Sequence, residues 1–337
     1  MKRLLLVLFV LAIAAPAQAQ DKLVVSIWGG SWRDLVADTV AKKFTAETGV
    51  GVDFITGGTI DRLNKARLAK DNPESDITFT TSHVGWLYAN SGLFEKLDVA
   101  KIPNASNLVD EARFSPFHLG SWAYIYTIGY RSDLIKDIKF GTWNDLWSPE
   151  LKGKIAAPDF DPSHLIVVAA ILSGGDAEHW QVGQDKLKAL KPNFKAFYSD
   201  DANSQQLLAS GETPVQDVLS MNAYYMIGQG VSITVDIPKE GGVLGVDAVA
   251  IMNGSKKAEL AYKFINALYD PAVQADIAKQ KKGSPVVLNA KLDPDLAKLP
   301  GVFTSAAQWK QQIVIDPKLR AEKLPEWRKW FSENIMN

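Results

Sequence analysis

The feature that most restricts the fold is an alternation of strand and helix patterns that begins at residue 23. Residues 23–27 form a short apolar run rich in β-branched side chains, which is typical of a buried strand. Apolar side chains then recur at helical offsets over 32–44, and residues 50–55 alternate in the manner of a strand. This order predicts a parallel strand pair with a right-handed crossover. A helix pattern over 60–70 and a strand pattern over 76–80 extend it to a doubly wound α/β unit.

The middle of the chain shows a second set of strand and helix patterns, so we expect a second α/β unit. The expected elements are an extended aromatic-rich stretch (121–130), a short capped helix (142–147), a buried helix (165–172), a strand (243–251) and a helix (258–268). The last segment, 309–337, mixes large aromatic side chains with charged ones. This mixture is typical of a helix that docks on the body of a protein.

The N-terminus has the pattern of a secretory signal peptide. Lys2 and Arg3 precede an apolar run over 4–15, and Ala17-Gln18-Ala19 supplies a small-x-small cleavage pattern. The apolar run is too short to cross a hydrocarbon core of about 30 Å as a helix. We therefore expect residues 1–19 to be a cleavable signal peptide and the remaining chain to be soluble and periplasmic.

Charge and cysteine content exclude several classes of protein. Without Lys2 and Arg3, 35 basic residues stand against 38 acidic ones, a net charge of −3, and nothing suggests a nucleic-acid partner. The sequence has no cysteine, so neither a disulfide nor a lipid-modified cysteine is available. We expect a freely diffusing monomer that is stabilised by its apolar core.

No common catalytic motif is present. The sequence lacks a Gly-x-Ser-x-Gly elbow, a Ser-x-x-Lys motif, a His-Glu-x-x-His motif and a P-loop, and its four histidines have no metal-ligand spacing. The best local cluster is Asp159 and Asp161 near His164, which we interpret as a solvated loop in preference to a metal site. A secreted enzyme is therefore only a distant alternative, and we expect no cofactor.

Several segments in a fixed order resemble a known family. Four groups of segments are similar to segments of the extracellular solute-binding proteins of ABC importers. In chain order they are residues 25–28 with 44–50, residues 91–98, residues 143–154, and residues 238–242 with Asp247 and 261–268. The resemblance is to the spermidine/putrescine-binding branch and covers nearly the whole mature chain. It implies a protein that captures a small solute and delivers it to an ABC permease in the inner membrane.

The same resemblance implies a type II periplasmic binding protein fold, with two hinge-linked α/β lobes and a ligand cleft between them. Residues 20–123 and 243–300 are then expected to form one discontinuous lobe, and 124–242 the other. The segment 301–337 is expected to dock on the body. Strands near 121–127 and 242–246 would cross between the lobes, which close on the ligand.

Two strand ends are candidate ligand contacts, because ligands of open α/β sheets bind beyond the carboxyl ends of the strands. After the first strand, Trp28 offers a stacking surface, and Gly29, Gly30 and Ser31 allow close approach to a helix N-terminus. The alternative is a simple turn with Trp28 packed between the lobes. After the third strand, Ser82 and His83 suit a polar ligand, although Ser82 is equally suited to cap the next helix.

In the polyamine-binding branch, an acidic residue just after the second crossing strand binds an amine of the ligand. Asp247 matches that position. A carboxylate in a dry cleft pairs well with an ammonium group. However, two tryptophans of the branch are replaced by Gly245 and Leu219. The ligand is therefore expected to be a polyamine or a shorter amino compound such as an amino-acid-like zwitterion. Arg33 could bind its carboxylate, although a solvated helix face is the preferred interpretation.

The segment Asn222-Ala223-Tyr224-Tyr225 supplies further candidates. Asn222 and Tyr224 are expected in the cleft as polar contacts to the solute. Ferric-ion-binding proteins of the same superfamily carry a tyrosine pair in this region, so Tyr224 and Tyr225 define an alternative iron site. An apolar packing role with one hydroxyl hydrogen bond is the simpler interpretation of such a pair.

Overall fold

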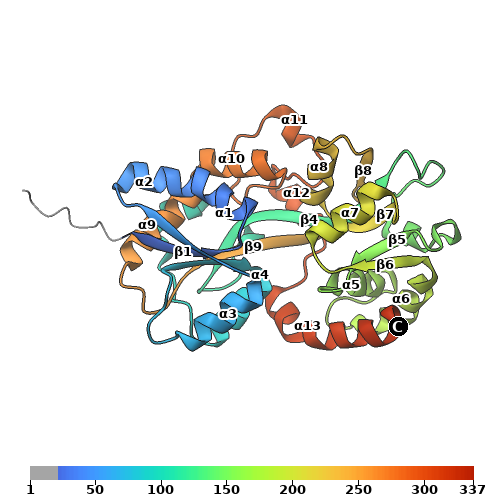
Figure 1. Ribbon diagram of the computed structural model, residues 1–337, viewed down its shortest axis with the longest axis horizontal. Coiled ribbons are helices and arrows are strands. Elements are labelled where there is room, and N and C mark those ends of the chain that lie inside the picture. Colours follow the sequence, from blue (N-terminus) through green and yellow to red (C-terminus); the bar gives the residue numbers. More distant parts are fainter. Residues whose placement is uncertain (1–21) are drawn as a thin grey trace, which may run out of the picture.

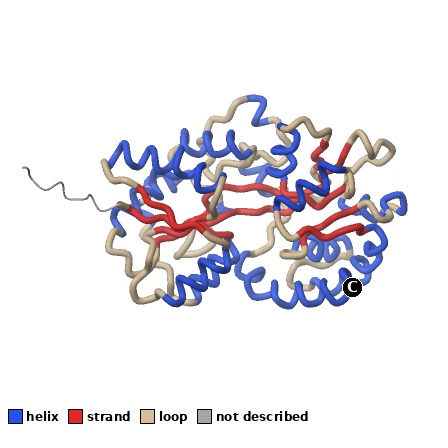
Figure 2. Tube along the Cα trace, viewed as in Figure 1, coloured by secondary structure: helices blue, strands red, loops and turns tan. Residues whose placement is uncertain are grey.

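The computed structural model describes residues 22–337, so the segment interpreted as a signal peptide lies outside the described residues. Its strands form one mixed sheet in the order β2-β1-β3-β9-β4-β7-β5-β6, with β8 paired to β4. Helices cover both faces of this sheet, and the strands run through the middle of an elongated molecule (Figure 2). Within residues 22–337, no helix is long and apolar enough to span a membrane.

The first lobe is built on the parallel strands expected from the sequence. Strand β1 lies between β2 and β3 and is parallel to both, and the helices between them return the chain in the same direction. A short π-helical turn joins α1 to α2, so the helix expected over 32–44 is longer and less regular. The elements are β1 (Leu23–Ile27), α1 (Ser31–Val36), α2 (Lys42–Thr48), β2 (Val52–Thr56), α3 (Thr59–Leu68), β3 (Ile77–Thr81) and α4 (Ser82–Asn90).

Two long strands run from the first lobe into the second. Strand β4 (Leu119–Arg131) pairs with β9 (Val243–Ile251) over its first part, and β9 also pairs antiparallel with β3. From Tyr126 onward, β4 pairs with β7 and β8 of the second lobe instead. Figure 1 shows β4 and β9 side by side at the centre of the molecule. The lobe boundaries expected from the sequence remain a prediction.

The second lobe repeats the α/β design on a smaller scale. Strand β5 lies between β6 and β7 and is parallel to both. The segment expected as a capped helix over 142–147 is a 3₁₀ helix, Trp143–Trp147, in which Thr142 and Asp145 form a capping box. The elements are β5 (Ile155–Pro158), α5 (Ser163–Leu172), α6 (Gln184–Leu190), β6 (Phe194–Tyr198), α7 (Asp201–Ser210), β7 (Val215–Leu219), α8 (Ser220–Gly228) and β8 (Ile233–Asp236).

The C-terminal third returns to the first lobe and then crosses back. Helix α9 carries a strongly amphipathic face, which it buries through Phe264, Ile265 and Leu268. Helix α13 packs against both α4 of the first lobe and α5 of the second, and it lies along the lower side of the molecule in Figure 1. The remaining elements are α9 (Ala258–Leu268), α10 (Pro271–Lys281), α11 (Pro294–Ala297), α12 (Ala306–Lys310) and α13 (Pro317–Phe331).

Candidate ligand-binding cleft

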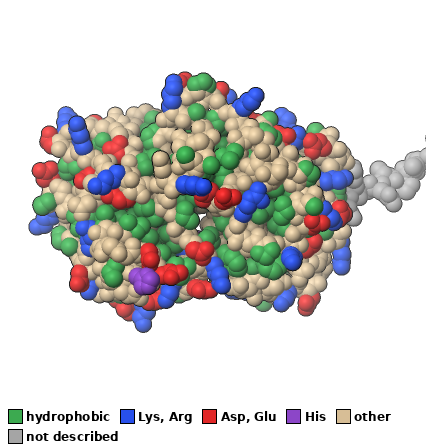
Figure 3. All heavy atoms as spheres, turned by 180° about the vertical axis from the view of Figure 1, so that it is seen from behind, with side chains coloured by type: hydrophobic (Ala, Val, Ile, Leu, Met, Phe, Trp, Pro, Cys, Tyr) green, Lys and Arg blue, Asp and Glu red, His purple; other side chains and the backbone are tan. Residues whose placement is uncertain are grey.

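Three connected hollows lie along the seam between the two lobes. A central hollow has a volume of about 480 Å³ and lies between a hollow of about 480 Å³ beside α4 and α13 and one of about 780 Å³ beside α8 and α10. The central hollow shares Thr81, Tyr124 and Tyr126 with the first and Trp32, Asp201 and Leu219 with the second. Figure 3 shows the molecule from behind relative to Figure 1. This face is indented near its middle, and acidic and basic side chains gather along the indentation.

Aromatic side chains from both lobes and from a crossing strand line the central hollow. Trp28 and Trp32 come from the start of the first lobe, and Phe160 comes from the loop after β5. Tyr124 and Tyr126 alternate on β4 and point to the same face, since successive side chains of a strand point to opposite faces. Such walls suit a ligand with an apolar stem or a cationic group.

Asp247 lies at the base of the central hollow. Its carboxylate accepts hydrogen bonds from Trp122 Nε1 at 2.9 Å and from the Tyr124 hydroxyl at 3.0 Å. Only 4% of the residue is exposed. Burial raises the pKa of Asp247 from 3.8 to about 7, although the two hydrogen bonds act in the opposite direction. This carboxylate is desolvated and lacks a cationic partner among the described residues, so a ligand cation would stabilise its ionised form.

Tyr124 fills the space above Gly245, which is one of the two positions where the resemblance led us to expect a tryptophan. A Cβ atom at residue 245 would lie 2.1 Å from Cε2 of the Tyr124 ring. The aromatic wall that β9 lacks is therefore supplied by the paired strand β4. Leu219, at the other such position, lines both the central hollow and the hollow beside α8.

The tryptophans of the first lobe are held by specific contacts. Trp28 donates from Nε1 to Thr59 Oγ1 at 2.7 Å, and the Arg62 guanidinium lies 5.1 Å from its ring centroid. Trp32 stacks on the buried Trp122 with a centroid distance of 5.2 Å. These contacts orient both indoles at the seam. Trp28 therefore lines the central hollow, and its role as a ligand contact remains a prediction.

The Gly-Gly turn takes a smaller part than expected. Gly30 has φ of 60° and precedes α1, which explains the glycine at this position. Neither Gly29 nor Gly30 lines the three hollows, whereas Ser31 lines the hollow beside α8 and α10. We predicted that both glycines contact the solute. This remains a prediction, and their position outside the three hollows does not favour it.

Ser82 and His83 line the hollow beside α4 and α13. Burial, assisted by the charge of Arg320, lowers the pKa of His83 to about 3, so this imidazole is neutral at physiological pH. Helix α4 begins at Ser82 itself, its N-cap residue is Thr81, and neither side chain caps the helix within the described structure. The capping role considered for Ser82 is therefore wrong, because Ser82 already has a helical position.

Asn222 and Tyr224 line the hollow beside α8. Asn222 donates to Asp201 Oδ1 at 2.9 Å, and the Tyr224 hydroxyl donates to the carbonyl of Pro300 at 2.6 Å. Tyr225 is 58% exposed, so the two adjacent tyrosines do not converge on one point. Among residues 22–337, no group of three His, Cys, Asp or Glu side chains is placed to hold a metal ion. Nothing in this region supports the iron alternative.

The cluster around Asp161 and His164 is buried, so its interpretation as a solvated loop is wrong. Arg320 of α13 donates from Nη2 to Asp161 Oδ2 at 2.5 Å and lies 2.9 Å from His164 Nε2. Burial alone would raise the pKa of Asp161, but the charges of Arg320, His164 and His83 and the hydrogen bond from Ser163 together outweigh it and hold that pKa well below its usual value. The His164 ring stacks on Tyr126 at 3.7 Å, which connects this network to the wall of the cleft.

Some cleft residues were not identified from the sequence. Tyr124 and Tyr126 were seen only as part of an aromatic-rich strand, although their i, i+2 spacing is the signal that they share a face. Arg320 reaches the cleft from a segment expected only to dock, and no local pattern marks it. Arg33 is paired with Asp34 at 2.8 Å with half of its side chain exposed, as expected for a solvated helix face.

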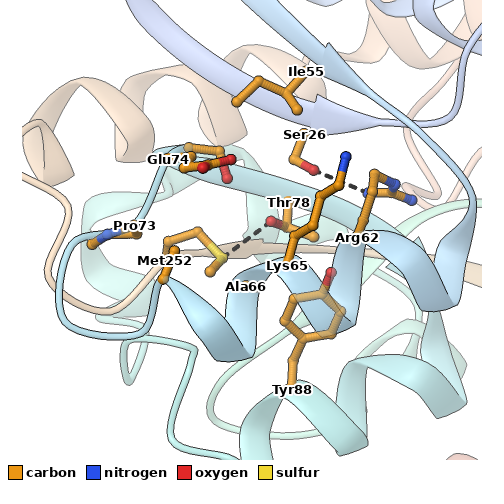
Figure 4. A pocket seen from close by; sticks show the side chains of 12 residues that line it. Ser26, Ile55, Arg62, Lys65, Ala66, Pro73, Glu74, Thr78, Tyr88 and Met252 are labelled. Atoms are coloured by element: carbon orange, nitrogen blue, oxygen red, sulfur yellow. Dashed lines mark hydrogen bonds between the residues drawn. The ribbon is translucent and has the colours of Figure 1, made fainter.

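A separate small cavity lies inside the first lobe and is not part of the cleft. Figure 4 shows Arg62 and Lys65 of α3 extending beside Ser26 of β1 and Thr78 of β3, and Thr78 donates a hydrogen bond to the sulfur of Met252. Its volume of about 30 Å³ is too small for an organic solute. Arg62 supports Trp28 from this side.

Two α/β lobes joined by crossing strands, with an aromatic and acidic cleft between them, define a two-lobed solute-binding protein. The chain matches the bacterial extracellular solute-binding protein family over residues 39–304, and it belongs to that family. Its fold and family are those of the substrate-binding components of ABC transporters and not those of an enzyme family.

Relatives and solved structures are consistent with this assignment. The chain is 29% identical to the spermidine/putrescine-binding periplasmic protein of Salmonella typhimurium over 307 residues, covering 84% of this chain and 86% of that protein. It is 30% identical to the Escherichia coli protein of the same name over 262 residues, covering 74% and 73%. An ABC transporter structure from Clostridium perfringens superposes with a TM-score of 0.82 at 28% identity, covering 93% of this chain and 100% of that one. The structure of a GABA receptor superposes with a TM-score of 0.80 at 25% identity, covering 94% and 98%.

Proposed function

We propose that this protein captures a small amine-bearing solute in the cleft and delivers it to an ABC permease in the inner membrane. The observation that carries this proposal is the buried, cation-free Asp247 carboxylate beneath walls of tryptophan and tyrosine. An ammonium group placed there would gain a charge-assisted hydrogen bond and contact with aromatic faces.

The comparisons support the same chemistry. The relatives named above carry names that refer to spermidine and putrescine, and the GABA receptor is named for a compound that also carries a primary amine. These compounds share an ammonium group on a short methylene chain. The Tyr124 ring over Gly245 retains an aromatic wall beside Asp247 where the polyamine-binding pattern has changed.

Calorimetry with and without the Asp247 carboxylate tests the proposal. The protein without its signal segment would be unfolded, freed of bound solute, refolded and titrated with putrescine, spermidine and γ-aminobutyrate. Asp247→Asn should weaken the amine that binds by about 1.5–3 kcal/mol, the scale of a hydrogen bond to a charged group. Asp53→Asn is the matched control, since Asp53 is an exposed aspartate that is paired with Lys22 at the surface. Failure of every amine to bind, or equal affinity in the Asp247 variant, would reject the proposal.

The location in the periplasm is part of the same proposal. It is supported by the signal-peptide pattern over residues 1–19 and by relatives that are periplasmic proteins. Release of the protein by osmotic shock, with a mature N-terminus at Gln20, is the expected result. Retention of the intact N-terminus in the cytosolic fraction would contradict it.

A further inference from the structure

An ammonium group of the protein itself already lies in the cleft, at the end of α10. Lys281 Nζ lies 4.2 Å from the ring centroid of Trp32 and donates to Ser31 Oγ at 2.9 Å. Both contacts come from the first helix of the same lobe. They hold the ammonium over one aromatic wall of the cleft, in the geometry that a ligand cation would adopt.

Lys281 also faces an acid of the opposite lobe. Asp201 of α7 lines the same hollow, and its carboxylate accepts a hydrogen bond from Asn222. Burial raises the pKa of Asp201, and Asn222 and the Lys281 charge oppose that rise. Burial lowers the pKa of Lys281, while Asp201 and Asp34 oppose that decrease. The lysine therefore supplies the positive charge for the acidic end of the cleft.

The central hollow continues directly into this end. Asp247 and Asp201 both line it, together with Asp200, whose carboxylate accepts a hydrogen bond from the Asn203 backbone in α7. A linear diamine with one ammonium on Asp247 would place its other ammonium either beside Asp201 or toward α13. The Lys281 charge already favours the ionised form of Asp201, and Arg320 and Arg328 line the hollow toward α13.

We propose that Lys281 takes the place of the second ammonium of a diamine, so that the cleft selects solutes with a single ammonium group. The inference rests on the proposed function, in which Asp247 binds the ligand amine. A second ammonium at the Lys281 end meets a like charge, which opposes binding of the wrong ligand. The ligand class is then a short primary amine whose other end is neutral or anionic.

Titration of single- and double-ammonium ligands against Lys281 variants tests this. Butylamine, γ-aminobutyrate and putrescine have chains of four carbons, and they carry one ammonium, one ammonium with a carboxylate, and two ammonium groups. The wild-type protein should bind butylamine or γ-aminobutyrate more tightly than putrescine. Lys281→Met keeps the unbranched stem and removes the charge. It should increase the affinity for putrescine about tenfold, while the affinity for butylamine, whose other end is uncharged, changes by less than about threefold.

Lys279→Met is the matched control, because Lys279 is exposed on the same helix and lies 3.9 Å from Asp293. It should leave the ratio of the affinities unchanged. Lys281→Gln provides a second neutral variant if Lys281→Met fails to fold, as judged by its melting curve. The relative affinities of butylamine and γ-aminobutyrate show whether the other end of the ligand is neutral or anionic, and a preference for either over putrescine supports the inference.

The outcomes separate the two proposals. If an amine binds through Asp247 but the ratio of putrescine to single-ammonium affinity is the same in wild type and Lys281→Met, the role of Lys281 is overturned while the proposed function stands. A wild-type preference for putrescine also overturns it. If no amine binds the wild-type protein, the proposed function fails, and the Lys281 inference fails with it.

Discussion

A carboxylate whose pKa lies close to neutrality couples ligand binding to proton release. Burial raises the pKa of Asp247 to about 7, whereas an ammonium ligand stabilises the ionised form and lowers that pKa. We predict that amine binding releases about one proton at pH 6 and almost none at pH 8.5. Calorimetry in buffers with different ionisation enthalpies measures this number. Proton release that persists unchanged in Asp247→Asn would show that another group is responsible.

The same pKa affects the stability of the ligand-free protein. Because the folded pKa of Asp247 is about 7 and the ordinary value is 3.8, the folded state holds a proton that the unfolded state loses between these pH values. The Asp247 contribution to stability therefore decreases as the pH rises from 4 to 7. Burial lowers the pKa of His83 to about 3, so the unfolded state binds a proton that the folded state does not. The contribution of His83 to folding stability therefore increases as the pH rises over much of the same range. The stability of Asp247→Asn relative to wild type should rise by about 4 kcal/mol from pH 4 to pH 7, as measured by urea unfolding, and a flat difference would contradict this.

The close packing of Tyr124 on Gly245 gives a second prediction at the residue scale. Gly245→Ala should destabilise the protein by about 1–3 kcal/mol, because its Cβ would lie 2.1 Å from the Tyr124 ring and the ring would have to move. The double variant Gly245→Ala/Tyr124→Ala should lose less than the sum of the single changes. Additive losses in urea unfolding would show that the two residues do not compete for this space.

Sequence reasoning identified the acid at this site but not the aromatic ring that accompanies it. Asp247 stands in a segment that resembles a known family, so its position was visible in the sequence. Gly245 suggested that one aromatic wall of the cleft is missing. A glycine shows that its own position carries no side chain, but it does not show which neighbouring side chain fills the space. Which neighbour fills that space depends on the register of β4 and β9, where Tyr124 lies opposite Gly245. This register is a tertiary property that no local pattern contains.

At the scale of elements, α13 is the segment with the largest difference between expectation and structure. Its docking was expected from the aromatic residues of the tail, and Trp327 and Phe331 are buried as that requires. Its second role is to bring Arg320 to Asp161, which lies 159 residues earlier in the sequence. Because an ion pair of such separation leaves no periodic pattern, the sequence indicated neither the burial of Asp161 nor the basic side of the cleft.

The ion pair of α13 can be tested by removing one or both of its charges. Arg320→Met should destabilise the protein by about 3–5 kcal/mol, since it leaves the Asp161 carboxylate buried without its cation. Arg320→Met/Asp161→Asn should recover part of this loss. Lys318→Met, on the same helix, serves as a control with little expected effect. If the double variant is less stable than Arg320→Met in urea unfolding, the buried charge is not the cause.

At the scale of the whole molecule, strands β4 and β9 lie at the crossing between the lobes. β4 is paired with β9 in the first lobe and with β7 and β8 in the second. Closure of such a molecule requires changes in a few backbone dihedrals at the crossing, and the ligand stabilises the closed form by its contacts with both lobes. The order of strands and helices was predictable because periodicity marks it, but the angle between the lobes was not.

Closure predicts a change in overall dimensions. The radius of gyration measured by small-angle X-ray scattering should decrease when a binding amine is added to saturation, and the fluorescence of Trp28 and Trp32 at the seam should change with the same midpoint. Asp247→Asn should show neither change at the same amine concentration. A fluorescence change at constant radius of gyration would indicate local binding without movement of the lobes.

The proposed amine anchor and the crossing between the lobes belong to the same pair of strands. Asp247 lies opposite Trp122 in the register of β9 and β4, and Tyr124 follows on the same strand. These three residues therefore move together, whereas Lys281, Trp32 and Asn222 are carried by the helices of one lobe or the other. If the proposed function holds, substitutions in the lobes exchange one cargo for another while the anchor and the closing motion are inherited unchanged. An importer built this way can acquire a new nutrient through few mutations.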